Sequence, residues 1–434
     1  MDKMLKEDWY ARMWLSSNIT IYYKGHIRWL QWDYSEKAFF NDEFFWCESL
    51  KDIEDFMQHF YHFDADLNII AIDNYTNEVL IYINDIWNMS LYINDKNELS
   101  SSINDLITNN SELDYQYLWL IRKFWYNQNN LTPYTNIKRL LPWYIYKGNK
   151  YTLYRDITSI KLRFGKLHQE FMLPLYLEDS VKNRLRTIED HTIWVLVSWW
   201  LDSSIITALL LKYNKDLESP KNFRFFTTEN AEDLKYAEEL ANFLWIKLEI
   251  IPWDDVELLW YELFEANETP IDLWSVVPNI KLFKRISSMW IKTVFTWDWP
   301  DEMFRWYRRN AEDFDYHKHD MLNELVYYHF PRLEKAARYY WINLVTPYIQ
   351  KNLWNMALTN EVKIYKWNLK DFANWLIPEC IIQRTKEPLK NKQIREDKIA
   401  YQHKFLNDFI YYAKEKCAST LTMKKWSQKL KEIL

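Results

Sequence analysis

The hydrophobic pattern of the chain changes character near residue 165. Before this point, apolar side chains recur at every second position in short runs bounded by Asn, Asp and Gly, which predicts β-strands. The clearest runs are 19–25, 68–74, 78–85 and 89–95. One amphipathic helix is expected over residues 49–63. This half therefore predicts a layered, mainly antiparallel β domain over residues 1–165.

From about residue 175 the pattern alternates between strands and helices. Expected strands are 192–198, 223–228, 246–251 and 292–296, and the segments between them have helical periodicity. Such alternation indicates a doubly wound parallel sheet, which binds ligands at the carboxyl ends of its strands. We assign this α/β domain to residues 166–434 and expect the part after about residue 315 to be helical.

Composition and charge narrow the class of protein. The net charge of −6 implies no broad attraction to nucleic acid or to anionic membranes. No apolar run approaches the roughly 20 residues needed to span a bilayer, and the first residues do not resemble a signal peptide. Cys47, Cys380 and Cys417 lie far apart without metal-ligand spacing. We therefore expect a reduced, cytoplasmic protein.

The glycine and tryptophan counts are abnormal. The chain has 3 glycines and 25 tryptophans, whereas glycine usually makes up about 7% of residues. A chain of this length needs glycine for left-handed backbone positions. The codon UGA is read as tryptophan in some genetic codes and as glycine in others. We therefore interpret most tryptophan letters as glycines, and an aromatic-rich core is the alternative.

The sequence around individual tryptophans supports this interpretation. Trp143 follows a proline, which is typical of a turn. Trp245 and Trp290 each lie between an expected helix and an expected strand, where a helix-ending glycine is common. Trp260 lies in a helical pattern instead and is a candidate for a genuine tryptophan.

Residues 198–204, SWWLDSS, follow a buried strand and begin a helix. With glycine at positions 199 and 200 the stretch reads SGGLDSS, which resembles the pyrophosphate loop of ATP pyrophosphatases. Backbone N–H groups and serine hydroxyls at a helix N-terminus can surround a phosphate, and an aspartate can hold Mg²⁺. An ordinary N-capped helix is the alternative.

A second loop makes the resemblance specific. Residues 296–307, TWDWPDEMFRWY, read TGDGPDEMFRGY with glycine in place of tryptophan. This resembles the acidic loop of the asparagine synthetase family, and a solvated acidic loop is the alternative. The resemblance extends over residues 165–395 and includes the QRTKEP segment at 383–388. Residues 1–165 resemble the family's glutaminase domain more weakly, in a degenerate form that implies an Ntn-hydrolase-like fold.

The resemblance implies that a carboxylate attacks the α-phosphate of ATP and releases pyrophosphate, after which an amine or ammonia displaces AMP to form an amide. The implied cofactors are ATP and Mg²⁺, with Asp202 and Asp301 as metal ligands. Asp298, Glu302 and Lys386 are the implied catalytic residues, although Lys386 taken alone is an ordinary surface lysine. The implied ATP- and pyrophosphate-binding residues are Val197, Ser198, Trp199, Trp200, Leu201, Asp202, Ser203, Ser204, Thr227 and Trp297.

Two departures from the family limit what the resemblance implies. Family glutaminases use an N-terminal cysteine, but Met1 is followed here by Asp2, so we expect no glutamine hydrolysis from this start. Asn343 and Val345 stand where the family usually has Glu and Arg, which leaves aspartate as substrate uncertain.

The sequence therefore predicts an ATP-dependent carbon–nitrogen ligase that amidates aspartate or a similar carboxylate. The alternative within the family is a ligase that closes a β-lactam or macrocyclic ring. A tRNA-modifying enzyme with a pyrophosphate loop and an inactive scaffold are alternatives of other classes. Expected partners are a small carboxylate and ammonia or an amine, with no nucleic acid and no membrane, and a homodimer is left open.

Overall fold

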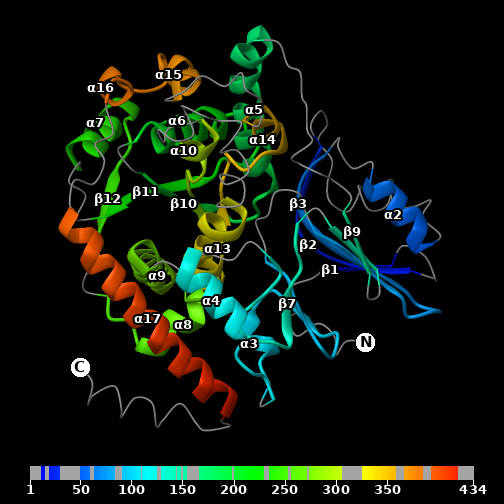
Figure 1. Cartoon of the computed structure of the whole chain (residues 1–434). Helices are drawn as coiled ribbons and strands as arrows, with labels where there is room; N and C mark the ends of the chain where they lie inside the picture. The colour runs from blue at the N-terminus through cyan, green and yellow to red at the C-terminus, as the bar shows by residue number, and fades with distance from the viewer. Residues whose placement is uncertain are drawn as a thin grey trace.

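The fold consists of an N-terminal β-rich part and a C-terminal α/β part (Figure 1). It is seen in a computed structural model of the chain. The structure describes residues 11–14, 19–29, 49–58, 63–83, 90–108, 110–124, 129–142, 144–147, 150–153, 166–197, 200–228, 234–252, 256–270, 273–304, 325–357, 366–384 and 392–418.

The N-terminal part contains two antiparallel sheets. The larger has six strands in the order β1-β2-β3-β4-β8-β9 and the smaller has three, β6-β5-β7. The strands are β1 (Ala11–Trp14), β2 (Ile19–Trp29), β3 (Phe63–Asp73), β4 (Val79–Tyr82), β5 (Tyr92–Asn94), β6 (Leu99–Ser100), β7 (Ile137–Arg139), β8 (Tyr144–Lys147) and β9 (Lys150–Leu153). The helices are α2 (Leu50–Gln58), α3 (Ile103–Leu106) and α4 (Tyr115–Phe124). The expected antiparallel pairing is observed, whereas the expected Ntn-hydrolase-like layering stays a prediction.

The C-terminal part contains a parallel sheet of five strands in the order β12-β11-β10-β13-β14. These strands are β10 (Thr192–Leu196), β11 (Asn222–Thr228), β12 (Leu248–Ile251), β13 (Thr293–Phe295) and β14 (Asn343–Val345). The accompanying helices are α5 (Lys166–Thr187), α6 (Leu201–Asn214), α7 (Leu234–Leu244), α8 (Trp260–Asn267), α9 (Leu273–Ser288), α10 (Pro300–Met303), the π-helix η2 (Leu325–His329), α13 (Phe330–Tyr339), α14 (Lys351–Ala357), α15 (Trp367–Ala373), α16 (Glu379–Ile382) and α17 (Lys392–Ala418).

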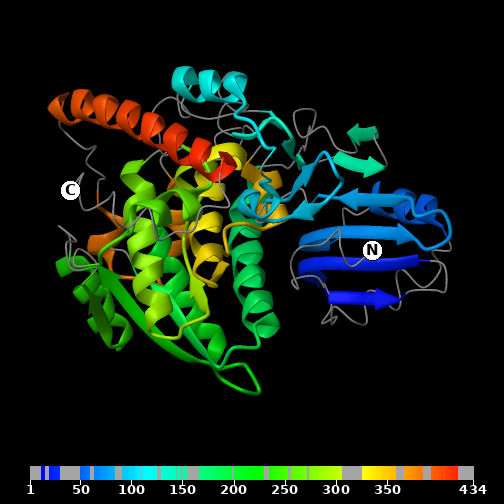
Figure 2. The ribbon, with the colours of Figure 1, turned by 90° about the horizontal axis from the view of Figure 1, so that it is seen from below.

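Helices cover both faces of the parallel sheet, which explains the apolar character of its central strands β10 and β13 (Figures 1 and 2). On one face, Ile193 and Val195 of β10 belong to the same buried cluster as residues of α5 and α6. On the other face, Trp194 and Phe226 pack in a cluster with residues of α9 and α13. The alternation of strands and helices therefore gives the doubly wound arrangement that the pattern predicts.

Two elements differ from the sequence-based expectation. The region after residue 315, expected to be helical, contributes the edge strand β14, because Asn343–Val345 pairs with Thr293–Phe295 along the open edge of the sheet. The helix expected over residues 49–63 ends at Gln58, and Phe63 begins a strand that pairs with β2 over eleven residues. In both cases pairing with a distant strand overrides the local pattern. The basic segment 423–434 lies outside the described residues.

An α-helix needs about 20 largely apolar residues to cross a bilayer. Within the described part of the chain, no helix combines the length and the apolar character needed to cross a bilayer.

Several tryptophans occupy backbone positions that normally require glycine. Trp245, Trp290 and Trp341 follow α7, α9 and α13 with φ angles of 55°, 61° and 61°. After α7 and α13, the backbone N–H groups of Ile246 and Ile342 donate hydrogen bonds to carbonyls five residues earlier. Such a bond is typical of the Schellman motif, a helix end at which glycine is favoured. Trp245 and Trp290 are more than nine-tenths exposed. These indoles therefore gain little from burial while their backbones have an unfavourable conformation.

Candidate active site

The strand order brings the two loops predicted from the sequence to the same edge of the sheet. β10 and β13 are hydrogen-bonded neighbours, and the chain reverses direction across the sheet between them. Such a switch point leaves a crevice at the carboxyl ends of the strands. Helix α6 starts directly after the loop that follows β10, and α10 starts after the loop that follows β13.

A buried lysine connects the two loops. The ammonium group of Lys366 forms an ion pair with Asp202 at the start of α6 and lies 2.5 Å from a carboxylate oxygen of Asp301 in α10. Lys366 is 4% exposed and Asp202 is also 4% exposed. Burial disfavours the charged form of Lys366, but the two carboxylates outweigh burial and raise its pKa. Asp202 and Asp301, predicted as metal ligands, therefore converge on one positive charge.

A pocket opens beside this ion-pair cluster. It encloses about 330 Å³, part of it open to solvent, and its lining includes Trp200, Lys366, Lys370 and Arg384. The guanidinium of Arg384 lies 4.1 Å from the centroid of the Trp200 ring. Burial and the charge of Lys366 lower the pKa of Lys370. The pocket thus combines several cationic groups with the first residues of α6, which suits phosphate groups.

The first turn of α6 uses its serine hydroxyls within the helix. Ser203 and Ser204 are buried, and both hydroxyls donate hydrogen bonds to the carbonyl oxygen of Trp200, at 3.1 and 2.9 Å. The sequence interpretation assigned these hydroxyls to a phosphate. In this structure both hydroxyls donate to the backbone instead. The first backbone N–H groups of a helix have no intrahelical acceptor, so at the start of α6 these groups are the ones left for a phosphate.

Hydrogen bonds hold together the strand ends that lead into the candidate site. The backbone N–H of Val197 donates to the carbonyl of Phe226 at 2.7 Å, which ties the end of β10 to β11. Thr227, the predicted nucleotide-binding residue on β11, is buried beside this contact. Tyr348 donates its hydroxyl to the carbonyl of Asp202 at 3.2 Å. The segment after β14 therefore also packs against the start of α6.

Two further acidic side chains belong to the second loop, and Glu302 is buried whereas Asp298 is partly buried. Burial raises the pKa of Asp298, against the opposing effects of Arg332 and Thr296. Burial raises the pKa of Glu302 to about 8, and the negative charge of Asp301 adds to this shift. Glu302 lies 3.8 Å from the imidazole of His329. Near neutral pH Glu302 therefore holds a proton and can donate a hydrogen bond.

The shifted pKa of Glu302 predicts a pH-dependent stability. Between the ordinary value of 4.5 and about 8, the folded protein binds a proton that the unfolded chain has released, so stability falls as pH rises through this window. Glu302→Gln should remove this slope, an effect of about 1–4 kcal/mol across the window. The measurement is urea unfolding in the presence of EDTA between about pH 5 and pH 9. Glu218→Gln, an exposed control, should keep the wild-type slope, and an equal slope for Glu302→Gln would contradict the prediction.

The backbone of the second loop has its own glycine-type position. Trp299 precedes α10 with a φ angle of 94° and is buried. Its ring packs against Phe330 and Trp354, with centroid distances of 5.8 and 5.0 Å. Trp297 is partly buried against the core. The indole at position 299 thus fills space behind the acidic loop.

Three predicted site residues lie outside the described part of the chain, and one residue of the observed site, Lys366, belongs to no motif in the sequence. Ser198, Trp199 and Lys386 lie outside the described residues. Lys366 belongs to no motif that the sequence analysis used, and it lies 164 residues from Asp202. Its only sequence signal is its place upstream of the QRTKEP segment in the region of resemblance.

The arrangement is chemically suited to Mg²⁺ when a nucleotide is bound. Within the part of the chain that the structure describes, no group of three or more His, Cys, Asp or Glu side chains is arranged to hold a metal ion. Magnesium commonly takes only one or two protein carboxylates and completes its shell with phosphate oxygens and water. Asp202 and Asp301 provide two such carboxylates, so the donor types fit, although in this structure the ammonium of Lys366 holds the position between them and the ion would have to lie beside it or displace it.

The comparison with family models bears on the family of the α/β part. Residues 174–355 match the model described as asparagine synthase. This match supports the asparagine synthase family for the α/β part of the chain. The matched asparagine synthase residues run from α5 to α14 and include both loops of the candidate site.

Individual relatives agree with this result. The chain is 25% identical to an asparagine synthetase [glutamine-hydrolyzing] of Sandersonia aurantiaca, over 48% of this chain and 45% of that protein. It is 27% identical to asparagine synthetase B [glutamine-hydrolyzing] of Escherichia coli (strain K12), over 49% of this chain and 43% of that protein. The chain matches only about half of the length of these curated relatives.

Solved structures add little. The U34-tRNA thiolase NcsA from Methanococcus maripaludis is 13% identical over 58% of this chain and 80% of that chain. The TM-score of 0.30 is too low to support any argument.

Proposed function

We propose that this protein is an ATP-dependent amide-forming ligase. A carboxylate oxygen of the acceptor attacks the α-phosphorus of ATP, and the bond to the β-phosphate oxygen breaks to release pyrophosphate. The nitrogen of ammonia or an amine then attacks the acyl carbon, loses a proton and displaces AMP. The observation that carries the proposal is the convergence of Asp202 and Asp301, from two asparagine synthase loops, on the single cation Lys366.

We assign the residues as follows. Asp202 and Asp301 would hold Mg²⁺, which supplies positive charge to the phosphates when it is bound. Lys366, Lys370 and Arg384 line the pocket and would neutralise phosphate charge. We further assign Lys386 to stabilising the developing charge, as the family resemblance implies.

Asp298 and Glu302 would handle the amine. Burial favours the neutral acid of Glu302, which can donate a hydrogen bond, whereas only an ionised carboxylate can accept a proton. An amine that has attacked the acyl carbon becomes acidic and must lose a proton. We therefore propose that neutral Glu302 positions the amine and that the ionised form of Asp298, which the charge of Arg332 favours, takes up its proton.

We also propose that the pyrophosphate loop contains glycine at positions 199 and 200, and that positions 245, 290, 299 and 341 are glycine as well. The last four have φ angles between 55° and 94°, each costing a non-glycine residue about 1–2 kcal/mol. In addition, the buried indole N–H group of Trp299 has no acceptor among the described residues, at a cost of about 1–3 kcal/mol. Tryptophan is unfavourable at these positions, and glycine has neither cost.

The function is tested by following pyrophosphate release from the purified chain with ATP and Mg²⁺. We expect release that depends on an acceptor carboxylate, with aspartate plus ammonium as the first pair and glutamine as a second nitrogen source. Activity with other carboxylates but not aspartate would favour ring closure or another amidation. Strong binding of tRNA without an amide product would favour RNA modification, and no nucleotide-dependent release with any acceptor would reject the ligase proposal.

A further inference from the structure

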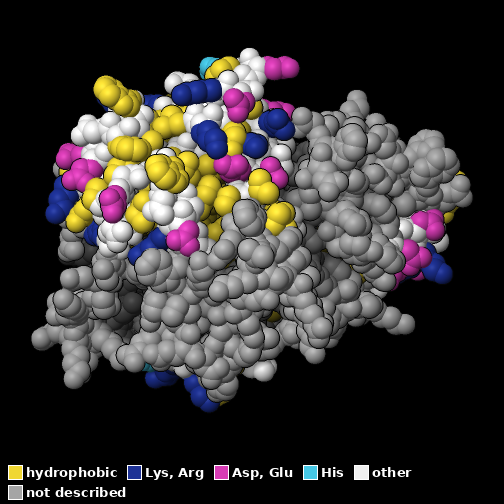
Figure 3. All heavy atoms as spheres, turned by 90° about the horizontal axis from the view of Figure 1, so that it is seen from above, with side chains coloured by type: hydrophobic (Ala, Val, Ile, Leu, Met, Phe, Trp, Pro, Cys, Tyr) yellow, Lys and Arg dark blue, Asp and Glu magenta, His cyan; other side chains and the backbone are white. Residues whose placement is uncertain are grey.

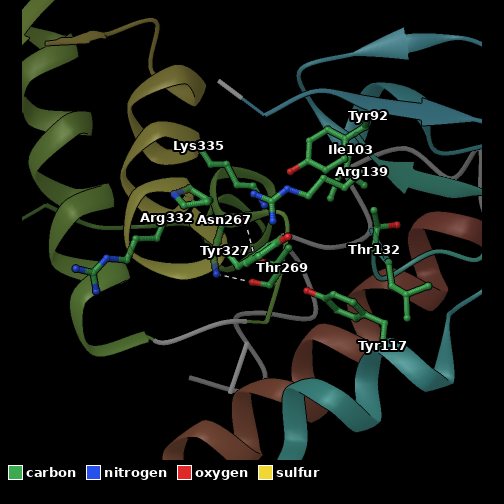
Figure 4. Close-up of a pocket in the computed structure, with 12 residues that line it drawn as sticks. Tyr92, Ile103, Tyr117, Thr132, Arg139, Asn267, Thr269, Tyr327, Arg332 and Lys335 are labelled. Carbon is green, nitrogen blue, oxygen red and sulfur yellow. Dashed lines mark hydrogen bonds between the residues drawn. The ribbon is translucent and has the colours of Figure 1, made fainter. Parts of the chain in front are cut away.

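A second cavity lies between the N-terminal part and the α/β part. Its empty space, counting the part open to solvent, is about 440 Å³ (Figure 4). Tyr92 and Arg139 reach it from β5 and β7, Tyr117 from α4, and Lys335 from α13. None of its lining residues also lines the pocket beside Lys366. The two cavities are therefore separate places in the molecule.

The cavity concentrates positive charge inside the protein. Arg139 and Lys335 are 8% and 4% exposed, and their charged ends approach one another from opposite sides in Figure 4. Arg332 also lines the cavity, but its guanidinium points away from the other two cations in Figure 4, and the described lining contains no carboxylate. Burial lowers the pKa of Arg139 to about 10, which leaves it charged at neutral pH. Two buried like charges that face each other favour the arrival of an anion.

The neighbouring acidic residues are shared with other cations. Glu268 lies 3.2 Å from Arg338 and 3.9 Å from Lys335. Glu334 lies 3.1 Å from Arg338. Arg338 therefore takes the shorter contacts with both carboxylates, while Glu268 also pairs with Lys335 and Glu334 acts on Arg139 at longer range. The three cations Arg139, Lys335 and Arg338 thus share two carboxylates, an excess of one positive charge.

The rest of the lining supplies hydrogen-bonding groups on a fixed framework. The hydroxyls of Tyr92, Tyr117 and Tyr327 belong to lining residues from three different elements. Thr269 donates to the carbonyl of Asn267 at 3.2 Å, and the Asn267 amide donates back to the carbonyl of Thr269. These two hydrogen bonds link Asn267 and Thr269 to each other within the loop that lines the cavity. Such a lining combines charge with oriented donors, as oxyanion sites do.

We infer that this cavity binds a small organic oxyanion, a carboxylate or a phosphate ester, held between Arg139 of the N-terminal part and Lys335 of the asparagine synthase domain. The ligand would join the two parts of the chain, because each contributes one of the two facing cations. The inference is independent of the proposed ligase reaction, which uses the other pocket.

The test measures anion binding to the full chain without nucleotide or magnesium, by calorimetry and by thermal unfolding. The probes are succinate, aspartate and inorganic phosphate, with the uncharged succinamide as comparison. We expect at least one anion to bind and to raise the unfolding temperature, while succinamide does neither. Binding of succinate or aspartate alone identifies a carboxylate ligand, and binding of phosphate alone identifies a phosphate ester.

Variants locate the binding. Arg139→Met and Lys335→Met should weaken it about 10- to 100-fold, because each removes a charged hydrogen-bond donor. Tyr117→Phe tests the same site with a smaller change, in case a charge variant fails to fold. Lys370→Met, in the nucleotide pocket, should keep full binding. The inference is overturned if no anion binds at tens of millimolar, or if Lys370→Met rather than Arg139→Met and Tyr117→Phe reduces binding.

Discussion

Asp202→Asn and Asp301→Asn are each expected to lower the rate of pyrophosphate formation about a thousandfold or more. Both carboxylates converge on one position between the two loops, where the charge of the nucleotide phosphates must be neutralised. Phosphate chemistry depends almost entirely on positioning and on charge neutralisation, so the loss of either carboxylate removes a large part of the rate enhancement. The measurement is pyrophosphate release at saturating ATP over a range of Mg²⁺ concentrations.

A second measurement separates this loss from unfolding. Each variant leaves Lys366 buried with one carboxylate instead of two, and removing a partner from a buried ion pair costs up to about 3–5 kcal/mol. We therefore expect a lower unfolding temperature together with weaker Mg²⁺-dependent ATP binding in calorimetry. Asp216→Asn, an exposed change after α6, should keep both properties. Full activity in a folded Asp202→Asn or Asp301→Asn variant would contradict the assigned metal ligands.

A chain with glycine at positions 199, 200 and 299 is expected to bind ATP with Mg²⁺ at least a hundredfold more tightly than a chain with the tryptophans as written. The indole of Trp200 lines the nucleotide pocket under Arg384, and glycine would let phosphate approach the N–H groups at the start of α6. Two synthetic genes, one encoding glycine and the other tryptophan at these three positions, supply the two proteins. Calorimetry then compares their affinities for ATP with Mg²⁺. Mass spectrometry of the protein from its natural source shows which reading occurs.

Stability provides an internal check on the same idea. Trp245→Gly, Trp290→Gly and Trp341→Gly should each raise the free energy of unfolding by about 1 kcal/mol, because glycine adopts positive φ without strain. The matched control is Trp260→Gly, which should cost about 3 kcal/mol. Trp260 begins α8 and packs on Phe264 at a centroid distance of 4.6 Å. Genuine tryptophan at positions 199 and 200 in natural protein would reject the glycine reading.

The molecular surface around α15 and α16 carries both signs of charge. Figure 3 looks onto this side of the molecule, and basic and acidic side chains are interspersed there with apolar ones. The cations that matter most for the two cavities, Lys366, Lys335 and Arg139, are buried instead. The net charge of −6 therefore conceals two places where cations gather inside the molecule, which only the burial of individual residues reveals.

The sequence alone determined the features that depend on local pattern. Alternating strands and helices gave the parallel sheet, because side-chain periodicity is set by the backbone geometry of each element. The loops around Asp202 and Asp301 were identifiable because each follows an expected strand and, with glycine in place of tryptophan, resembles a loop of the asparagine synthetase family. The scarcity of glycine was visible as a count, and the helix-ending positions of Trp245 and Trp290 were visible from their neighbours.

The tertiary structure decided what depends on contacts between distant segments. The order of strands, with β10 beside β13, places the two loops together, and it follows from packing of helices on both faces rather than from any one segment. Lys366 and the strand Asn343–Val345 acquire their roles only from partners far along the chain. The facing cations Arg139 and Lys335 come from separate parts of the molecule. Long-range pairing of this kind leaves no periodic signal, because periodicity records the face an element buries and not the partner it buries that face against.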